Sequence, residues 1–473
     1  MSDMVEQLIE VCAPERVSSK LPDRICYTRD AGPSPGGIPG VVVRPTTPQE
    51  VAGVLCVANE HRTPVFLWGR STTFIGAGIQ TGCILMALDL MNKVIEMDFD
   101  NKVVAVEPGI VWHALDVELN RHGWELGVPG PGGMFSCTVG GSVAYDAVPH
   151  ALAEYGMTGE HVVGLEVVLP DGTILNTGSG ANEAAGHLHF ERYANGPDLT
   201  GLFIGSYGVF GVITKVYFRI RRVPDVEMYA FYGFDHFEQA VDAAHAIQRQ
   251  DAATHLVGLF GGPKPADYEA HDAFLHIVVR DSRAAAPERL RVAEAICEAF
   301  QGCPLDSNAT RLYWEGHMYS WLRNTPPDHY YGNRPFMCPE VAGFMPTEKV
   351  KDAIAFLRAD AEEHAEEFAR YDIRIKCHDV YFSRNAAFIW IDTLYPELEE
   401  ESWKYGLALR SRLTDELCRR YMSPGGILQA IAPEVMTKMG AGFEFMKQLK
   451  TWMDPNYILN PGIMYLEPEA SHA

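Results

Sequence analysis

The sequence has 473 residues, 47% of them hydrophobic and 21% charged, which is too long for one ordinary core and too apolar for long disordered tracts. Its formal net charge of −23 disfavours nucleic acid and anionic lipid as main partners. The chain has no apolar run that could span a membrane and no signal-peptide pattern, and its ten cysteines include no C-x-x-C pair. We therefore expect a cytoplasmic protein of two or three domains, without a structural metal or a disulfide framework.

The first third of the chain alternates predicted helices and strands. After a short N-terminal helix, Thr47 can cap a helix whose apolar residues recur at helical spacing as far as Ala58. WHALDVELNRHG is a second helix, ended by Gly123. Further on, a hairpin is predicted around Asp171-Gly172. The expected strands are VVVRP, VFLW, CILMAL, KVIEMD, KVVAVEPG, GLEVVLPDGTIL and VFGVITKVYFRIRRVP.

The composition changes after Pro224. Residues 225–415 contain two passes of helix and strand, among them FEQAVDAAHAIQRQ, TEKVKDAIAFLRADAEEHAEEFARY and AAFIWIDTLY. The stretch 311–339 is rich in aromatic residues, and the tail returns to helices before MDPNYILNPG. The pattern predicts an α+β protein whose organisation changes after Pro224.

A glycine-rich loop follows the predicted strand VFLW. Residues 69–78 (GRSTTFIGAG) place glycines where backbone N–H groups can approach an anion, and they add hydroxyl donors and the positive charge of Arg70. The loop is neither G-x-G-x-x-G nor a P-loop, so a generic nucleotide fold is not indicated. A similar glycine-rich stretch recurs at 129–142. Two such loops in one domain predict a seat for a pyrophosphate group.

Many separate motifs occur in one order along the chain: the GRS loop, MNKVIEMD, VEPG, TVGGS, GLEVVLPDGTILNTGSGA, YANGP…GLF, GVITKV and DPNYILNPG. This order resembles the flavoprotein superfamily of vanillyl-alcohol oxidase and p-cresol methylhydroxylase, and also the related D-lactate dehydrogenase and glycolate oxidase flavoproteins. The resemblance covers 40–222 and the last twenty-odd residues. It implies a two-part FAD-binding domain of the p-cresol methylhydroxylase type over 1–222, an inserted α+β substrate-binding cap over 223–415, and a C-terminal segment, 416–473, that returns to the FAD domain.

The resemblance also assigns residues to the cofactor. The first loop would hold the FAD pyrophosphate through backbone N–H groups, and the second would pass along flavin and pyrophosphate. A strand would lie beside the adenine, and an asparagine near the isoalloxazine ring. The residues concerned are Gly69, Arg70, Ser71, Thr72, Thr73, Gly132, Gly133, Thr138, Gly140, Gly141, Ser142, Val212, Ile213 and Asn460. Val212 and Ile213 are equally interpreted as a core strand.

The cap matches neither branch of the superfamily in full. The D-2-hydroxy-acid branch carries an H-x-G-D-G-N-x-H-like run, which is absent from 376–385, although Arg374, Lys376 and Arg384 could still bind a carboxylate. In the vanillyl-alcohol branch, a tyrosine, an aspartate and a C-terminal Tyr-Arg pair stabilise a phenolate. Here Phe74 and Met157 replace the first two, and the end has no Tyr-Arg pair.

This mixture predicts a relative with its own substrate. The motifs lie closer to the vanillyl-alcohol branch, and the aromatic stretch is suited to stacking on an aromatic ring. Ordinary packing of the cap core is an equally good interpretation for any single aromatic residue. The candidate substrate residues are Phe74, Tyr145, Met157, Trp314, Trp321 and Tyr465.

The expected reaction is hydride transfer from a C–OH group or an activated benzylic carbon to flavin N5. His378, Tyr381 or Arg384 would act as the base or polarise the substrate oxygen. The position at which relatives attach flavin covalently falls on Arg384 or Asn385, so we expect non-covalent FAD.

Three other functions stay open: a D-2-hydroxy-acid dehydrogenase or oxidase, a flavin electron-transfer subunit, and a ligand-binding protein without cofactor. The electron acceptor would be O2 or an electron-acceptor protein, and the resemblance implies a homodimer.

Overall fold

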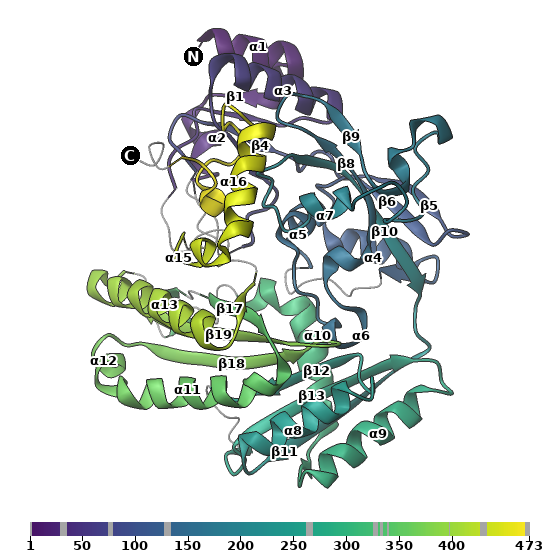
Figure 1. The fold of residues 1–473 in the computed structure, drawn as a ribbon, viewed down its shortest axis with the longest axis vertical. Coiled ribbons are helices and arrows are strands. Elements are labelled where there is room, and N and C mark those ends of the chain that lie inside the picture. Colours follow the sequence, from purple (N-terminus) through teal and green to yellow (C-terminus); the bar gives the residue numbers. More distant parts are fainter. Residues whose placement is uncertain are drawn as a thin grey trace.

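The computed structural model describes residues 2–28, 36–73, 79–126, 134–261, 268–324, 330–331, 334–337, 340–396, 398–425 and 433–468. In these residues the chain forms three sheets (Figure 1). Two sheets, from residues 17–222, lie with the C-terminal helices at one end of the molecule, and we call this part the two-sheet region. The third sheet and its helices, residues 226–424, form the cap. This mixture of helices and sheets confirms the predicted α+β class.

The first sheet has the strand order β1-β2-β4-β3. Strands β2 and β3 both run parallel to β4, an arrangement that needs a crossover helix. That helix, α3 (Pro48–His61), begins as predicted, because the Thr47 side chain accepts a hydrogen bond from the Glu50 N–H at 3.2 Å. The other elements are α1 (Ser2–Cys12), β1 (Val17–Ser18), α2 (Leu21–Ile25), β2 (Val41–Val43), β3 (Val65–Trp68) and β4 (Ile84–Ala87).

The second sheet is antiparallel, with the order β5-β6-β10-β8-β9, and β7 pairs with the end of β10. The predicted hairpin is confirmed between β8 and β9, where Gly172 has a φ of 89°. The strands are β5 (Val94–Asp98), β6 (Val103–Val106), β7 (Trp124–Leu126), β8 (Val162–Val168), β9 (Ile174–Asn176) and β10 (Val212–Arg222). The helices are α4 (Trp112–Asn120), α5 (Val139–Tyr145), α6 (Leu152–Tyr155) and α7 (Leu199–Phe203).

The cap sheet has the order β14-β11-β13-β12-β18-β19-β16-β15, and β17 pairs with both β19 and β20. Its strands are β11 (Val226–Phe234), β12 (His255–Leu259), β13 (Ala273–Asp281), β14 (Cys303–Pro304), β15 (Tyr330–Tyr331), β16 (Arg334–Met337), β17 (Glu340–Met345), β18 (Arg374–Phe382), β19 (Ala387–Pro396) and β20 (Ser423–Pro424). Its helices are α8 (Phe237–Gln248), α9 (Ala286–Ala299), α10 (Ser307–Asn324), α11 (Val350–Glu363), α12 (Ala365–Arg370) and α13 (Glu400–Arg420).

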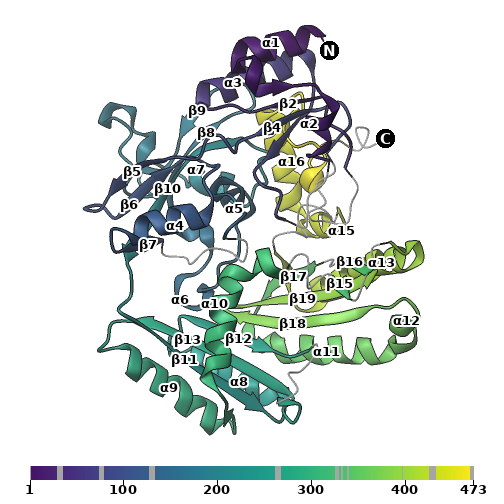
Figure 2. The same cartoon turned by 180° about the vertical axis from the view of Figure 1, so that it is seen from behind.

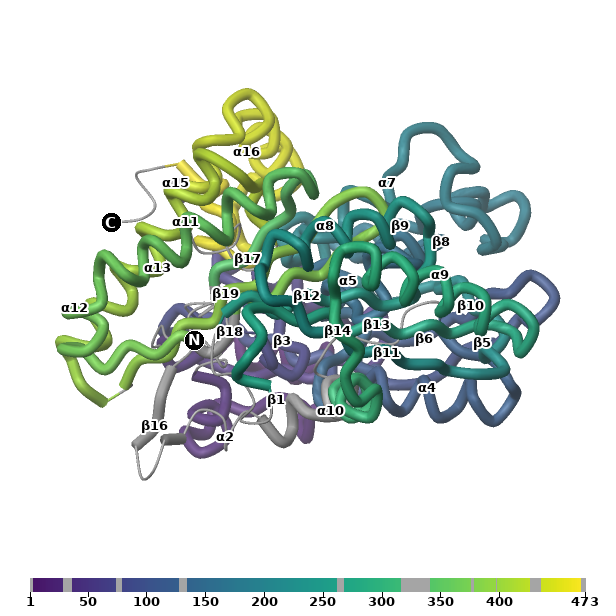
Figure 3. Tube along the Cα trace, turned by 90° about the horizontal axis from the view of Figure 1, so that it is seen from below, coloured from purple at the N-terminus to yellow at the C-terminus, as the bar shows by residue number. Residues whose placement is uncertain are grey.

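The two faces of the cap sheet are covered differently. Helices α8, α9, α11 and α13 bury their apolar sides on the outer face, which can be followed from below in Figure 3. The opposite face is turned towards the two-sheet region and meets α10 together with α6 (Figure 2). We call it the inner face. Because successive residues of a strand point to opposite faces, each cap strand contributes alternate side chains to the inner face.

The chain returns to the two-sheet region through α15 (Pro433–Met436) and α16 (Ala441–Met453). Leu459 then forms a parallel bridge with Val65 on β3. The expected boundary at residue 415 falls inside α13, and β20 still pairs with β17, so the cap sheet continues beyond that boundary. Among the described residues, no helix is both long and apolar enough to cross a lipid bilayer.

Candidate functional site

The first glycine-rich loop begins at the end of β3, and its hydrogen-bond donors have no partner among the described residues. The N–H groups of residues 69–73 and the hydroxyls of Ser71, Thr72 and Thr73 form no hydrogen bond with any described residue. Ser71 adopts a left-handed backbone conformation with a φ of 48°. Consecutive free N–H groups around a left-handed residue form a concave seat for an anion. The donor set fits one face of a diphosphate.

The two glycine-rich loops meet in space. A Cβ atom on Gly69 would lie 2.6 Å from the Thr138 Oγ1, and one on Gly140 would lie 2.4 Å from the Cβ of Pro108. Thr138 caps α5 by accepting a hydrogen bond from the Gly141 N–H at 3.4 Å. Two segments some seventy residues apart in the sequence therefore form one cradle, which any side chain at position 69 would obstruct.

In the described part of the second loop, the N–H groups of residues 139–142 are already engaged within the protein. The N–H groups of Val139 and Gly140 donate to backbone oxygens at 2.9 and 2.8 Å, and that of Ser142 donates to the Thr138 oxygen at 3.0 Å. The Ser142 hydroxyl accepts from the Trp112 indole N–H at 2.8 Å. Gly140 and Ser142 therefore hold α5 in place, and among the described residues the free donors of the cradle come from the first loop. Gly132 and Gly133 lie outside the described residues.

Asn460 joins three segments beside the cradle. Its side-chain oxygen accepts from the Leu67 N–H at 2.9 Å, and its side-chain nitrogen donates to the Tyr207 oxygen at 2.7 Å. Asn460 is buried and has a φ of 42°, a conformation that asparagine tolerates better than most residues. Its side chain holds the end of β3 at a defined distance from the loop after α7. The predicted contact with the isoalloxazine ring stays a prediction.

A fully buried ion pair lies beneath Asn460. The Lys450 ammonium donates to the Asp454 carboxylate at 2.7 Å and to the Val209 and Leu459 oxygens at 2.8 Å each. Asp454 also accepts from two N–H groups of the chain that follows it. Burial lowers the pKa of Lys450. This ion pair, which we call the clamp, was not predicted from the sequence, although a lysine stands four residues before the aspartate of DPNYILNPG.

Val212 and Ile213 begin β10 and lie in two different hydrophobic clusters. Both are buried, which agrees with their interpretation as a core strand.

A line of apolar and aromatic side chains crosses the inner face of the cap sheet. The strand register pairs Tyr381 with Val257 on one side and with Phe388 on the other, and Phe388 pairs with Phe344. Tyr381 is 8% exposed, and its hydroxyl lies 3.5 Å from the Tyr313 hydroxyl on α10. Side chains that are partly buried continue this surface: Leu259, Met157 and Trp390. The inner face is therefore suited to an apolar, flat ligand.

The three predicted catalytic residues do not lie together. Because residues three apart on a strand point to opposite faces, His378 lies on the outer face when Tyr381 lies on the inner one. A Cβ on Gly261 would lie 2.5 Å from His378 Nδ1, and burial lowers the pKa of His378 to about 4. Arg384 lies in the turn after β18 and forms an ion pair with Glu160 of the two-sheet region. Only Tyr381 lies on the inner face.

The candidate substrate residues are also divided. Met157 packs in the same cluster as Tyr381, and Trp314 is buried against Val278 and Tyr155. The other two described side chains belong to the two-sheet region: Tyr145 at the end of α5, in edge contact with Tyr207, and Tyr465 in the C-terminal segment. Phe74 lies outside the described residues, as does the side chain of Trp321, which is on α10.

Several side chains of this face were not predicted from the sequence: His255, Phe388 and Trp390. The alternation within HLVGL and AFIWID was the signal that could have found them.

Buried and half-buried ion pairs join the cap to the two-sheet region. Arg280 on β13 donates to both carboxylate oxygens of Glu125 on β7, at 3.0 and 2.8 Å. Arg221 binds the same carboxylate at 3.1 Å, and Arg280 also binds Glu227 at 2.6 Å. Two-pronged arginine–carboxylate contacts define orientation as well as distance. They set the position of the inner face relative to the cradle.

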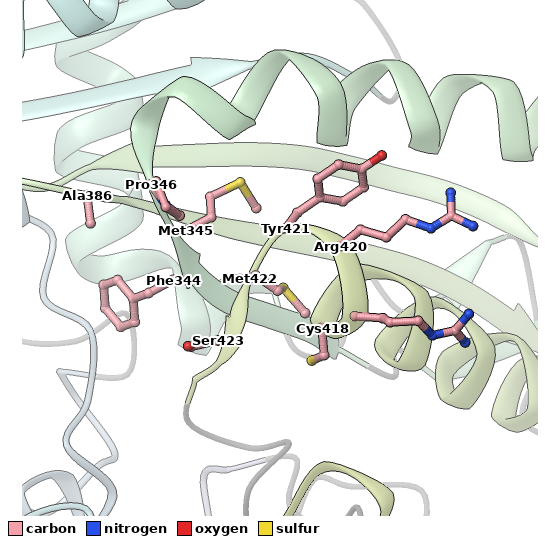
Figure 4. A pocket seen from close by; sticks show the side chains of 10 residues that line it. Phe344, Met345, Pro346, Ala386, Cys418, Arg420, Tyr421, Met422 and Ser423 are labelled. Carbon is pink, nitrogen blue, oxygen red and sulfur yellow. The ribbon is translucent and has the colours of Figure 1, made fainter. Parts of the chain in front are cut away.

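A separate groove of about 390 Å³ opens near the ends of β17 and β20 (Figure 4). It is lined by Phe344, Met345, Pro346, Ala386 and the segment 418–423. The arginines of that segment, Arg419 and Arg420, pair with acidic side chains of α13. None of the predicted catalytic residues lines this groove.

Two family models match the chain. The FAD binding domain model matches residues 39–178, which include both glycine-rich loops, and the model for the C-terminal domain of FAD linked oxidases matches residues 432–464. Among curated proteins, the glycolate oxidase subunit GlcD of Bacillus subtilis (strain 168) is 26% identical over 98% of this chain and 97% of its own length. The mitochondrial D-lactate dehydrogenase [cytochrome] of Arabidopsis thaliana is 33% identical over 44% of this chain and 35% of its own length.

Solved structures share the fold over almost the whole chain. A substrate-bound p-cresol methylhydroxylase has a TM-score of 0.79 at 18% identity, with 98% of this chain and 96% of that chain covered. The isoeugenol complex of 4-ethylphenol oxidase from Gulosibacter chungangensis has a TM-score of 0.80 at 16% identity, with 99% and 98% covered. The predicted p-cresol methylhydroxylase type of fold and the predicted FAD cofactor are confirmed.

Proposed function

We propose that the chain, which matches models of the FAD binding domain and of FAD linked oxidases and shares the p-cresol methylhydroxylase fold, is an FAD-linked oxidoreductase that oxidises a C–OH group or an activated benzylic carbon of a small aromatic substrate. One observation carries the proposal. The inner face of the cap presents a line of aromatic and apolar side chains around Tyr381, opposite the two-sheet region that holds the cradle. Aromatic side chains favour the faces and edges of an aromatic ligand.

FAD, when bound to the cradle, supplies the acceptor for the hydride that leaves the substrate carbon. The protein's own part is to bind and orient the substrate. The Tyr381 hydroxyl, 3.5 Å from the Tyr313 hydroxyl, is positioned to hydrogen-bond the substrate oxygen and to take part in moving its proton. Phe388 and Met157 exclude water beside it.

A second candidate is the oxidation of a D-2-hydroxy acid, which the similarity to GlcD and to D-lactate dehydrogenase favours. Such a substrate needs a cation for its carboxylate. Of the candidates named from the sequence, Arg374 donates to Asp372 at 2.9 Å, and Arg384 pairs with Glu160. Both arginines already have a carboxylate partner, which favours the aromatic substrate. The side chain of Lys376, the third candidate, lies outside the described residues.

An anaerobic screen of the flavin-loaded protein tests the proposal. Hydroxybenzyl alcohols, aryl-propanoid dimers and D-2-hydroxy acids are offered in turn while the flavin absorbance is followed. We expect at least one aromatic alcohol to bleach the flavin. Bleaching by D-2-hydroxy acids alone would establish the second candidate, and a flavin that no donor reduces but that exchanges electrons with a protein partner would indicate an electron-transfer subunit.

The variant Tyr381→Phe tests whether the Tyr381 hydroxyl takes part in the reaction. It removes the hydroxyl and keeps the ring, so we expect flavin reduction by the active alcohol to slow about a hundredfold, in the range of one lost proton-transfer group. Tyr232→Phe is the matched control, because Tyr232 is buried among the helices on the outer face. Equal rates in Tyr381→Phe and the wild type would contradict the assignment. The acceptor, the homodimer and the cytoplasmic location stay predictions from the sequence.

A further inference from the structure

A hydrogen-bond donor and an acceptor are buried together on the inner face without partners. His255 on β12 and Trp314 on α10 are each 1% exposed, and their ring centroids lie 5.0 Å apart. Neither His255 Nε2 nor Trp314 Nε1 has a hydrogen-bond partner among the described residues, so the two do not bond each other. A buried polar atom without a partner costs free energy, which indicates that something else binds here.

The contacts of His255 define its protonation. Its Nδ1 faces the backbone oxygen of His150, which can only accept, so the proton lies on Nδ1. Burial lowers the pKa of His255 well below its ordinary value, so the ring is neutral. In a neutral imidazole with its proton on Nδ1, the Nε2 atom carries a lone pair that can accept a hydrogen bond. His255 therefore offers one acceptor.

Trp314 offers the complementary group, since an indole N–H can only donate. A single atom that satisfies both residues must accept from Trp314 and donate to His255. A hydroxyl oxygen does both, whereas a carboxylate or carbonyl cannot donate and an ammonium cannot accept. Among the described residues, the rings of His150, Tyr313 and Tyr381 lie around the pair, and none of these three side chains carries a positive charge that would stabilise an ionised oxygen.

The pair lies next to the proposed reaction surface. On β12, His255, Val257 and Leu259 share the inner face, and exposure decreases from Leu259, which is half-buried, to His255. Val257 is paired with Tyr381, and the His255 and Tyr381 ring centroids lie 5.9 Å apart. At this distance the two rings are in edge contact, so a small aromatic substrate that lies across them would reach both. A substrate held at Tyr381 would extend its far end to His255 and Trp314.

We propose that His255 and Trp314 form a subsite that binds a second, un-ionised hydroxyl group of the substrate. This inference rests on the proposed function, since it takes the inner face as the place where the substrate lies. It narrows the substrate class to compounds with one oxidisable carbon and a neutral hydroxyl at the far end. The other source of a hydroxyl at this place is a trapped water molecule.

Calorimetric binding to the flavin-loaded protein tests the subsite without requiring turnover. The ligands are 4-hydroxybenzyl alcohol and 4-methoxybenzyl alcohol, which differ because the ether oxygen can accept but cannot donate. We expect the hydroxyl compound to bind the wild type at least tenfold more tightly, because the ether leaves the His255 lone pair unsatisfied. Trp314→Phe removes the donor and keeps an aromatic ring, and it should reduce this preference to about threefold or less.

His255→Gln and His255→Phe complete the test. A glutamine oxygen can take the place of Nε2, so His255→Gln should retain the preference, whereas His255→Phe should lose it. If His255→Phe fails to fold, the comparison of Trp314→Phe with His255→Gln decides. Tyr232→Phe is the control and should bind both ligands as the wild type does.

Three results would overturn the subsite. They are equal binding of the two ligands by the wild type, no binding of either ligand, and an undiminished preference in Trp314→Phe, which would mean that the pair holds a trapped water only. Failure of the proposed function would look different. In that case the hydroxyl preference would be present in binding, but no aromatic alcohol would bleach the flavin.

Discussion

The cradle in the two-sheet region and the inner face of the cap are built from different parts of the chain. At the cradle the working groups belong to the backbone: consecutive N–H groups after β3, and glycines at positions where a Cβ would lie within 2.6 Å of a neighbour. On the inner face the working groups are side chains, such as Tyr381 and His255, that strand register brings side by side. The cradle therefore depends on positions where a side chain is absent, and the inner face depends on the chemistry of the side chains that are present.

This difference explains how each site can vary. A cradle made of backbone accepts one kind of ligand, because its donors are the same whichever residues surround it. An inner face made of side chains can change its ligand when one residue on a strand is exchanged. The match to the FAD binding domain model follows the same division, since it ends at residue 178, before the cap begins.

The largest effect is expected at the clamp that holds the C-terminal segment against the cradle. Lys450→Met leaves the Asp454 carboxylate buried without a cation and two backbone oxygens without a donor. Breaking a buried pair in this way should lower the free energy of unfolding by about 3–5 kcal/mol. Denaturant unfolding, together with the flavin content of the purified protein, measures the effect.

Lys447→Met is the matched control for this change. Lys447 lies on the same helix but is half-exposed, and its contact with Glu444 is 3.7 Å long. Its loss should cost about 0.5 kcal/mol or less. Similar losses in the two variants would show that the buried pair contributes no more than a surface lysine.

The next effect concerns the cradle itself. Gly69→Ala places a Cβ 2.6 Å from the Thr138 Oγ1, so either the loop or the cap of α5 must shift. Overpacking of this kind costs up to about 3 kcal/mol, which corresponds to about a hundredfold loss of FAD affinity. Titration of the apoprotein with FAD measures it.

Two further variants distinguish the steric contact between residue 69 and Thr138 from a general loss of folding. Gly442→Ala is the control, since a Cβ there would meet no atom within 4 Å. Thr138→Ala in the Gly69→Ala background removes the crowded oxygen and should restore part of the affinity. If Gly69→Ala binds FAD as tightly as the wild type, the cradle does not hold the diphosphate at this point.

The sequence predicted the fold and the cradle better than it predicted the inner face. Gly69, Ser71 and Thr138 could be placed because glycine-rich loops after a strand are local patterns with a local physical reason. The hairpin at Gly172 and the helix after Thr47 were found for the same reason.

The inner face depends on contacts that no local pattern encodes. His255 and Trp314 are 59 positions apart and meet only because α10 crosses the strand. The sequence left His378 and Tyr381 as alternative bases because it does not show which face of the sheet each side chain occupies, whereas a strand separates residues three apart onto opposite faces. Which residues of a strand point to the inner face depends on its partner strands, and the sequence alone does not give that information.

The smallest effect is expected on the pH dependence of stability, and it tests whether His378 is buried on the outer face of the cap sheet. Its pKa is lowered from an ordinary 6.5 to about 4, because burial disfavours the charged ring. Between these pH values the unfolded chain binds more protons than the folded protein, so stability must fall as the pH falls. From pH 7 to pH 5 the loss in the free energy of unfolding attributable to this one histidine is about 2 kcal/mol.

His378→Asn should remove that part of the pH dependence, measured by denaturant unfolding at both pH values. His236→Asn, at an exposed position of the cap, should leave it unchanged. An unaltered slope in His378→Asn would mean that the ring is not shielded from water among the helices of the outer face, and the assignment of His378 to that face would fall with it.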